Sequence, residues 1–577
     1  MACLIALLLW SPGSLSAQGL NDPYVLNAPR FRETFFLKTD RNLYAAGESI
    51  HFRAFNLSHP LLKENDWSTV LYLEVVNGRK VAVAQGKFPL DHGSVAGRLV
   101  LPDTISSGNF FLRAYTKWMR NFPPSGYSYV PLAIVNPQQL NLETLDYRSG
   151  TSREGAEPGM DQPMLQKLKP LHQGLHCSTD ASSYAKREKV TIQIGTGAEL
   201  DPSQGLAVSV AKADYIDSAE TCYSGLTVGI PQGPESVRFI PETRGISLDG
   251  LVVQGADEHP VPNAAMHLTL LGEEPDYMGL VADKNGRIHF AIPPHQGASN
   301  ALINFNTNGG SAYKLILEDA FSNEYFQGAL PGMDFFTGRM EVLEEMLMYV
   351  QLKEAFGITV PIPVSAEDTA EAPYFYGSPE YRYKPADYIQ IPNLEEFLFE
   401  LVPYVVIRKR KETYEVAMMD DAGFYLNNAP LILLDHVAVQ DLEALFKTDP
   451  RFIEYIDVIN TPYIRGGNYY GGILSVLSEA GNLAGVGLPE GSTIIDLQTY
   501  QDPDTRLPQD LAPRTLEDHL PDLRTLLFWN PELIIAPGHQ TGVQFVTSDI
   551  KGSYVVSVTG MSKSGQVIED HCLFQVE

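Results

Sequence analysis

The sequence lacks the residue patterns of the common catalytic sites. It has no His-Glu-x-x-His, no paired Cys-x-x-Cys, no Gly-x-Ser-x-Gly and no phosphate-binding loop that ends in Lys-Ser or Lys-Thr. Its 13 histidines are scattered along the chain. These absences argue against zinc proteases, serine hydrolases and nucleotide-binding enzymes. We therefore expect a protein that is not an enzyme and that holds no metal or cofactor.

Positive charge and long apolar runs are also scarce. The 577 residues include 42 Lys and Arg against 70 Asp and Glu, a formal net charge of −28. Such an acidic chain is a poor candidate for binding nucleic acid or anionic lipid. Beyond the N-terminus, no segment approaches the roughly 18 consecutive apolar residues of a membrane-spanning helix. The 44% hydrophobic content is ordinary for a globular protein, and the length predicts about four domains.

The N-terminus has an apolar run at residues 1–10, followed by small residues up to Ala17. This pattern predicts a signal peptide over residues 1–18, and therefore export, although no basic residue precedes the run. Its removal leaves three cysteines, and an odd number allows at most one intrachain disulfide. Cys177 and Cys222 are the candidate pair, and free buried thiols are the alternative.

One stretch in the C-terminal half has the pattern of a compact α/β module. Pro430–Leu434 is a continuous apolar run that predicts a strand buried on both faces. Val439–Phe446 has apolar residues at helical spacing, and Ile453–Ile459 is a second apolar run. The glycine pairs 466–467 and 471–472 permit tight turns around the strands that follow.

These three blocks, in this order, resemble the plug domain of TonB-dependent outer-membrane receptors over residues 400–490. The family usually has Gly after the aspartate of the first block, where this chain has His436. The resemblance implies a partner-docking surface, for which the candidate residues are Asp435, Gly466, Gly467, Tyr469, Tyr470, Gly471 and Gly472.

A receptor of that family surrounds its plug with a barrel of about 22 strands. The residues after 490 are too few for such a barrel, because each strand needs about 9–11 residues. We therefore expect the module to act by docking to a separate outer-membrane barrel or envelope complex.

Residues 30–137 have the short, regularly spaced strands of a β-sandwich. Within them, Ile50–Ala54 alternates apolar side chains with His51 and Arg53, which predicts a half-buried strand. The motifs Leu-Lys-Thr-Asp-Arg at 37–41 and Asn-Phe-Phe-Leu-Arg-Ala-Tyr at 109–115 resemble the second macroglobulin domain of α2-macroglobulin-type proteins. The Cys-Gly-Glu-Gln thioester of the protease-trapping relatives is absent, which excludes covalent trapping.

The segments that follow predict further β-sandwiches. Residues 138–170 form a linker rich in Gly, Pro, Ser and acidic side chains. Residues 171–245 repeat part of the first motif and predict a second macroglobulin-like sandwich. Residues 246–330 resemble carboxypeptidase-regulatory-like β-sandwiches, which have no catalysis of their own. Residues 515–577 resemble a C-terminal macroglobulin-like β-domain. Between these sandwiches, residues 331–399 predict a helix over 338–357 and then an extended linker. A further helix is expected to start at Pro392, with Asn393 as its cap, and to lead into the plug-like module.

The segments predict a mainly β, multidomain fold: tandem immunoglobulin-like or macroglobulin-like β-sandwiches with one small α/β plug-like module. The expected function is a non-enzymatic scaffold that binds protein partners in the periplasm or at the outer membrane. The alternative is a steric, thioester-free protease inhibitor of the macroglobulin type. A cleavable bait segment would then lie at residues 149–163 or 358–390.

Overall fold

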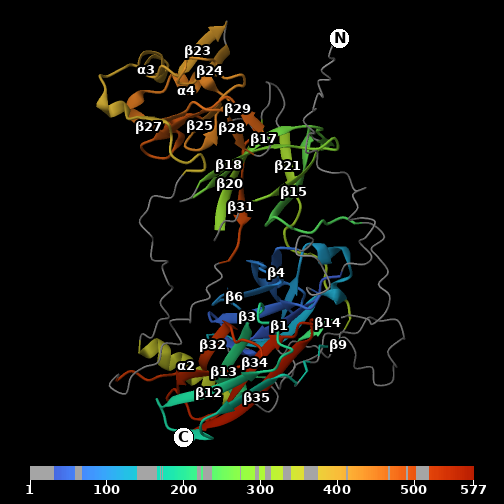
Figure 1. Ribbon diagram of the computed structural model, residues 1–577. Coiled ribbons are helices and arrows are strands. Elements are labelled where there is room, and N and C mark those ends of the chain that lie inside the picture. The colour runs from blue at the N-terminus through green and yellow to red at the C-terminus, as the bar shows by residue number, and fades with distance from the viewer. Residues whose placement is uncertain are drawn as a thin grey trace, which may run out of the picture.

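The computed structural model describes most of the chain. The expected signal peptide at 1–18 lies outside the described part, as does most of the predicted linker at 138–170. The described residues are 32–58, 68–138, 166–168, 170–171, 173–216, 222–224, 237–255, 257–272, 275–292, 298–305, 313–328, 340–356, 374–410, 413–465, 468–488, 491–501 and 519–577. They form a mainly β, multidomain fold, as predicted, with the sandwiches and the α/β module following one another from one end to the other (Figure 1).

The main strands of the first sandwich lie within residues 35–135, and two short strands from later in the chain extend one of its sheets. One sheet has the order β1 (Phe35–Thr39), β3 (Ser49–Asn56), β6 (Ser94–Val100). The other has the order β5 (Ala82–Pro89), β4 (Val70–Asn77), β7 (Gly108–Tyr115), β8 (Ser128–Val135), with β2 (Leu43–Ala45) beside β8 and the short β14 (Tyr223–Ser224) and β9 (Gln166–Lys167) beyond it. Strand β3 is buried on both faces, not half-buried, because the second sandwich covers the side that carries His51 and Arg53.

The second sandwich is assembled from two segments that lie far apart in the sequence. Its sheets have the orders β10–β12–β33 and β11–β35–β34–β13–β32. The earlier segment supplies β10 (Leu175–Thr179), β11 (Ser183–Tyr184), β12 (Lys189–Thr196) and β13 (Leu206–Lys212). The later segment supplies β32 (Leu526–Leu533), β33 (Gln540–Val546), β34 (Gly552–Met561) and β35 (Val567–Val576). The prediction of separate sandwiches at 171–245 and 515–577 is therefore wrong, because each segment holds only part of both sheets.

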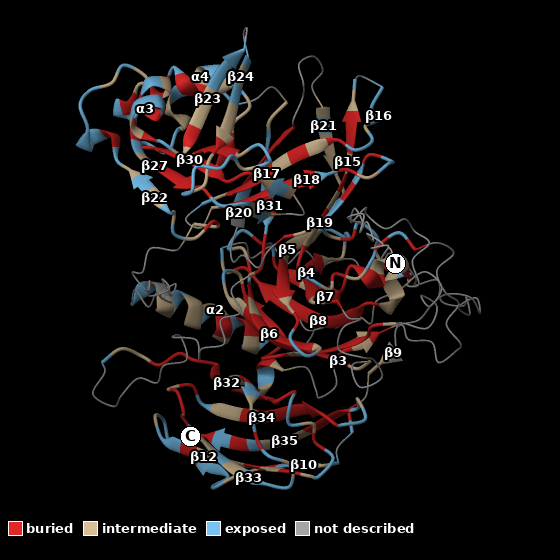
Figure 2. Cartoon of the chain, turned by 45° about the horizontal axis from the view of Figure 1, so that its top comes forward, coloured by how far each residue is buried: buried red, intermediate tan, exposed pale blue. Residues whose placement is uncertain are grey.

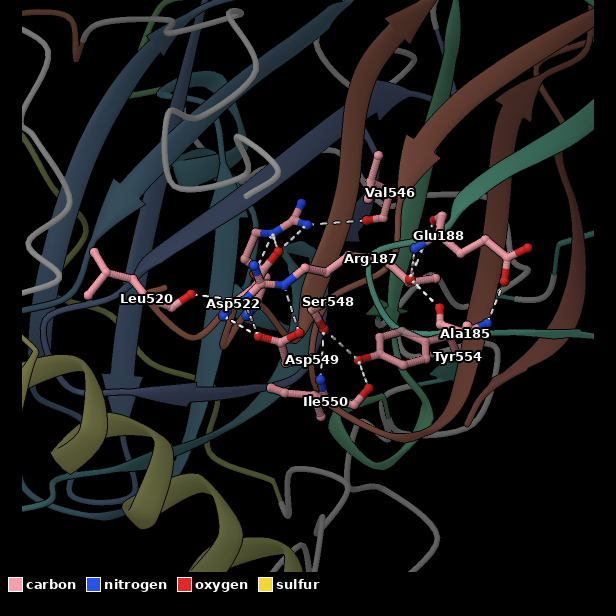
Figure 3. Close-up of polar contacts among 12 residues, drawn as sticks. Ala185, Arg187, Glu188, Leu520, Asp522, Val546, Ser548, Asp549, Ile550 and Tyr554 are labelled. Atoms are coloured by element: carbon pink, nitrogen blue, oxygen red, sulfur yellow. Dashed lines mark hydrogen bonds and ion pairs between the residues drawn. The ribbon is translucent and has the colours of Figure 1, made fainter. Parts of the chain in front are cut away.

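Polar contacts join the two segments at one end of this sandwich (Figure 3). The Arg187 guanidinium donates to both carboxylate oxygens of Asp549, at 2.8 and 2.6 Å, and to the Leu520 carbonyl at 2.9 Å. These hydrogen bonds hold the pKa of Asp549 below its usual range. Beside them, the backbone amide of Thr547 donates to the Glu188 carbonyl at 2.9 Å. The two segments are thus tied by a charged pair as well as by strand pairing.

The third sandwich is also discontinuous. One sheet contains β16 (His259–Pro260), β15 (Ser247–Gln254), β19 (Arg287–Ala291) and β21 (Tyr313–Leu317). The other has the order β18 (Asp276–Val281), β17 (Ala265–Leu271), β20 (Ala298–Phe305), β31 (Thr493–Gln498). Because β31 comes after the α/β module, the module is an insertion in the third sandwich, and the third sandwich is an insertion in the second.

The predicted helix at 338–357 is present as α2 (Met340–Ala355). Its Leu343 and Met346 are buried against β2, β8 and Tyr215. This methionine-bearing face is therefore part of a core beside the first sandwich.

The α/β module follows at residues 374–488. Its five-stranded sheet has the order β22 (Tyr381–Tyr383), β27 (Ile453–Ile459), β30 (Ile473–Ser478), β25 (Leu431–Leu434), β26 (Val437–Ala438). Its remaining elements are α3 (Leu394–Leu401), the hairpin β23 (Val405–Arg410)–β24 (Thr413–Met418), α4 (Leu442–Phe446) and the hairpin β28 (Tyr463–Arg465)–β29 (Asn468–Tyr470). The predicted strands and both predicted helices are confirmed, and Asn393 caps α3 as expected. The short strand β22, however, lies within the segment 331–399 that was predicted to be helix and linker.

Candidate interaction surface

One face of the module's sheet is covered by its own helices, and the other packs on the third sandwich. In β25, Ile432 and Leu434 belong to the cluster that contains α3 and α4, whereas Leu431 and Leu433 pack in a cluster with Tyr277 of β18. Thr269 and Asn304 donate side-chain hydrogen bonds to the carbonyls of His436 and Ala438, both at 3.2 Å. The predicted burial of this strand on both faces is thus confirmed.

The hairpin β28–β29 lies against β18 of the third sandwich. Arg465 forms an ion pair with Asp276 and donates through Nε to the Tyr277 carbonyl at 3.2 Å. The hydroxyls of Tyr470 and Tyr277 are 3.1 Å apart, and the Tyr277 hydroxyl is 2.7 Å from Nδ1 of His267. Burial lowers the pKa of His267 to about 4, so this imidazole is neutral at pH 7. The side chain of the candidate docking residue Tyr470 is therefore engaged in a contact with the third sandwich of the same chain.

The next residue, Tyr469, faces the opposite way. Side chains alternate along a strand, so Tyr469 and its cross-strand partner Ile464 lie on the outer face of the hairpin. Their exposed fractions are 65% and 60%. Of the candidate docking residues that the structure describes, Tyr469 is the one with a large, exposed side chain.

Asp435 stabilises a turn within the module. Its carboxylate accepts hydrogen bonds from the Ser478 amide at 2.7 Å, the Ser478 hydroxyl at 2.6 Å and the Leu483 amide at 2.7 Å. Asp435 and His436 have φ values of 47° and 68°, the left-handed region in which glycine is the easiest residue to place. His436 adopts this conformation between β25 and β26, so the departure from the family pattern leaves the turn intact.

Gly471 and Gly472 are buried and structural. A side chain at Gly471 would overlap the backbone of Asn428, whose carbonyl carbon would lie 2.8 Å from the added Cβ. Gly472 has a φ of 89°, and a Cβ there would overlap the Ile459 carbonyl. Gly466 and Gly467 lie outside the described residues. Gly471 and Gly472 thus allow close backbone packing in the module, and they have no side chain with which to contact a partner.

The exposed aromatic side chains gather on this module. Seven Phe and Tyr side chains are strongly exposed in the described chain, and all but Phe356 lie on the module. The six are Tyr388, Phe399, Phe424, Tyr425, Phe452 and Tyr469. Figure 2 shows exposed residues at the outer ends of β23 and β24, at the end of the molecule away from the C-terminus. Exposed aromatic groups are typical of protein-binding surfaces.

Of these six residues, only Tyr469 was a candidate docking residue on the basis of the sequence. Phe424 and Tyr425 follow Gly423 in a turn, outside the apolar periodicity of any strand or helix. Phe399 lies on α3 next to the buried Leu398 and is 74% exposed. The available signal was an aromatic residue at a position that the apolar spacing of the neighbouring strands and helices does not explain.

Among the described residues, no group of three or more His, Cys, Asp and Glu side chains is placed to hold a metal ion. No helix in the same residues is both long enough and apolar enough to cross a membrane. The Arg382 guanidinium donates to both carboxylate oxygens of the buried Asp457, at 2.6 and 2.7 Å, and this contact joins β22 to β27.

The predicted disulfide between Cys177 and Cys222 does not form. Both residues are free thiols in separate cores: Cys177 lies within the second sandwich, and Cys222 lies within the cluster of the first. The Cys222 sulfur accepts a hydrogen bond from the Leu37 amide at 3.4 Å. Cys177 and Cys222 are close in sequence, but the fold places them in different sandwiches.

Comparison with known proteins gives only remote similarities. No family model and no curated protein sequence matches the chain. Among solved structures, trypsin-activated α2-macroglobulin from Escherichia coli matches 95% of this chain and 42% of that chain, at 9% identity and a TM-score of 0.23. Salmonella α2-macroglobulin reacted with methylamine matches 97% and 40%, at 10% identity and a TM-score of 0.23. Dimeric latent PorU from Porphyromonas gingivalis matches 49% and 34%, at 8% identity and a TM-score of 0.16.

The chain spans about two-fifths of the length of the α2-macroglobulins that it matches. TM-scores this low assign neither a family nor a function. The function must be inferred from the residues of the chain itself.

Proposed function

We propose that this protein is a non-enzymatic, exported scaffold of the cell envelope, in which the sandwiches hold the α/β module out toward a protein partner. The observation that carries the proposal is that six of the seven exposed Phe and Tyr side chains of the described residues lie on that module. The plug-like sequence of the module makes an outer-membrane barrel, or a complex that contains one, the favoured partner.

The internal packing of the module supports a docking role. The inner face of its β28–β29 hairpin is held by the Arg465–Asp276 ion pair and by Tyr470 against Tyr277, which fixes the outer face without a partner. A preorganised surface loses less conformational freedom on binding than a flexible one does. Tyr469 is thus presented by a rigid support.

The hairpin offers a matched pair of positions for a crosslinking test. We expect a photoreactive residue at position 469 to crosslink an outer-membrane barrel protein in intact cells, because this side chain is 65% exposed. The same residue at position 470 should give no such adduct, because that side chain lies against Tyr277. Mass spectrometry of the adducts provides the measurement.

A barrel protein recovered equally from both positions would show that the adduct is non-specific. Adducts from position 469 only with soluble proteins, or no adduct at all, would contradict docking to a barrel. We also expect Tyr469→Ala to weaken capture of the partner by roughly tenfold or more, the effect of losing an interfacial aromatic anchor worth about 2 kcal/mol.

Steric inhibition of proteases is the second candidate function, and one observation favours it. Ile389, in the candidate bait segment 358–390, is 83% exposed within irregular backbone between η8 (Pro385–Asp387) and α3. The candidate segment 149–163 lies outside the described residues. An exposed, irregular segment is a suitable protease substrate.

Incubation with a panel of proteases separates the two functions. If the protein is a scaffold, we expect no loss of protease activity toward a large protein substrate, whether or not the chain is cut near Ile389. Cleavage at this segment together with loss of that activity, while hydrolysis of a small peptide substrate persists, would favour the inhibitor. Denatured protein serves as the control for cleavage without trapping.

A further inference from the structure

Two cysteines that the sequence analysis did not pair lie together in the second sandwich. Cys177 on β10 is 5% exposed, and Cys572 on β35 packs against the same apolar cluster. The Cys177 amide donates to the Asp570 carboxylate at 2.8 Å, which places β10 beside this part of β35. The two thiols lie within hydrogen-bonding reach of each other.

We propose that Cys177 and Cys572 form a disulfide that joins the two segments of the second sandwich. Strands β10 and β35 belong to different sheets, so the bond would link the sheets as well as the segments. It would add a covalent link to a sandwich whose segments are held by Arg187 and Asp549 (Figure 3) and by strand pairing. The bond would close a loop that contains the third sandwich and the α/β module, and long closed loops restrict the unfolded chain most.

The two thiols differ in a way that defines the order of reaction. Their mutual hydrogen bond lowers the pKa of Cys572, and the same bond raises the pKa of Cys177. Cys572 is also the more exposed of the two. Its thiolate is therefore the nucleophile toward an incoming disulfide.

The reaction balances as a thiol–disulfide exchange. Cys572 loses its proton and attacks a protein or small-molecule disulfide, which forms a mixed disulfide and releases one thiol. Cys177 then loses its proton, bonds to the Cys572 sulfur and displaces the second thiol. Two protons and two electrons leave the cysteine pair, and the oxidant is reduced to two thiols.

Cys222 provides a natural control for this chemistry. It is fully buried in the first sandwich, where burial raises its pKa to about 12. A thiol in that environment is a poor nucleophile and has no neighbouring cysteine in its cluster.

Oxidation of the purified full chain tests the pairing directly. We expect incubation of the reduced protein with oxidised glutathione to remove two alkylatable thiols and to yield, after digestion, a peptide pair linked through Cys177 and Cys572. Cys222→Ser should give the same linked pair. Cys177→Ser should instead keep a glutathione adduct at Cys572. Both cysteines recovered in alkylated form, or a link to Cys222, would overturn the proposal.

The proposal rests on the export assumed under the proposed function, because disulfides persist in oxidising compartments. The linked peptide should therefore also be found in protein taken from cells whose thiols were alkylated at lysis. Its presence after oxidation in vitro but absence from cells would overturn export and the disulfide in the cell, while the paired geometry would stand. In oxidised protein, reduction should lower the thermal midpoint by about 5 °C or more for the wild type and for Cys222→Ser, and should have no such effect on Cys572→Ser.

Discussion

Replacement of Arg113 by leucine is expected to lower the free energy of unfolding by about 3–5 kcal/mol. Arg113 on β7 and Glu74 on β4 are both 1% exposed, and two guanidinium nitrogens contact the Glu74 carboxylate at 2.6 Å. The variant leaves the Glu74 charge buried, with hydrogen bonds only from Tyr115 at 2.8 Å and Gln85 at 2.7 Å. An uncompensated buried charge costs more than the pair itself contributes.

The same guanidinium also joins the first sandwich to the chain that leaves the third. It donates to the carbonyls of Ser322 and Glu324 at 2.6 and 2.8 Å. We therefore expect Arg113→Leu to release residues 319–328 from the first sandwich. Increased hydrogen exchange at these residues would show the release, and urea unfolding would measure the loss of stability.

Two controls make this prediction specific. The double variant Arg113→Leu/Glu74→Leu removes both charges and should regain most of the lost stability. The ion pair between Arg410 and Glu415 is exposed, with side chains 68% and 53% accessible, so Arg410→Leu should change stability by less than about 1 kcal/mol. A loss below about 1 kcal/mol for Arg113→Leu would contradict the prediction.

Gly471→Ala is expected to destabilise the α/β module by about 3 kcal/mol or more. The added methyl would overlap the carbonyl of Asn428 and come within 2.8 Å of its carbon. These are backbone atoms, so a rotamer change cannot relieve the overlap. The Gly471 amide also donates to the Ala429 carbonyl at 3.0 Å, which restricts the shift that the chain can make.

Gly487→Ala is the matched control, because nothing lies within 4 Å of the Cβ that it adds. We expect it to change stability by less than about 0.5 kcal/mol. Hydrogen exchange at β25 and β30 should increase in Gly471→Ala alone, with the second sandwich unchanged. Equal protection in the two variants would show that the backbone absorbs the methyl.

The strands and helices of the module were predictable because each corresponds to a short, continuous pattern of apolar residues in the sequence. The apolar run 430–434 predicted a strand buried on both faces, and both faces are covered: by the helices on one side and by Tyr277 on the other. Side-chain alternation along β29 puts Tyr469 and Tyr470 on opposite faces of the strand, although both were candidate docking residues. Which of the two faced solvent depended on β18, a strand almost 200 residues earlier, and no local pattern contains that information.

The strand pairing of the sandwiches could not be read from the sequence for a related reason. β13 pairs with β32 and β34, yet nothing in Leu206–Lys212 distinguishes those partners from nearer strands. The entropy of closing a loop grows slowly with its length, so distance along the chain is a weak guide to pairing. The same limit explains the choice of Cys222 as the partner of Cys177, when the nearest thiol in space is 395 positions away, on Cys572.

The nested insertions impose an order on folding during synthesis. Strand β13 is complete about 310 residues before β32 begins. At a synthesis rate of roughly 5–20 residues per second, β13 remains without its partner strand β32 for on the order of 15–60 s. The α/β module can close first, the third sandwich only after β31, and the second sandwich last. Until then the half-built sandwich exposes unpaired strand edges, so a holding chaperone would be needed most in that interval.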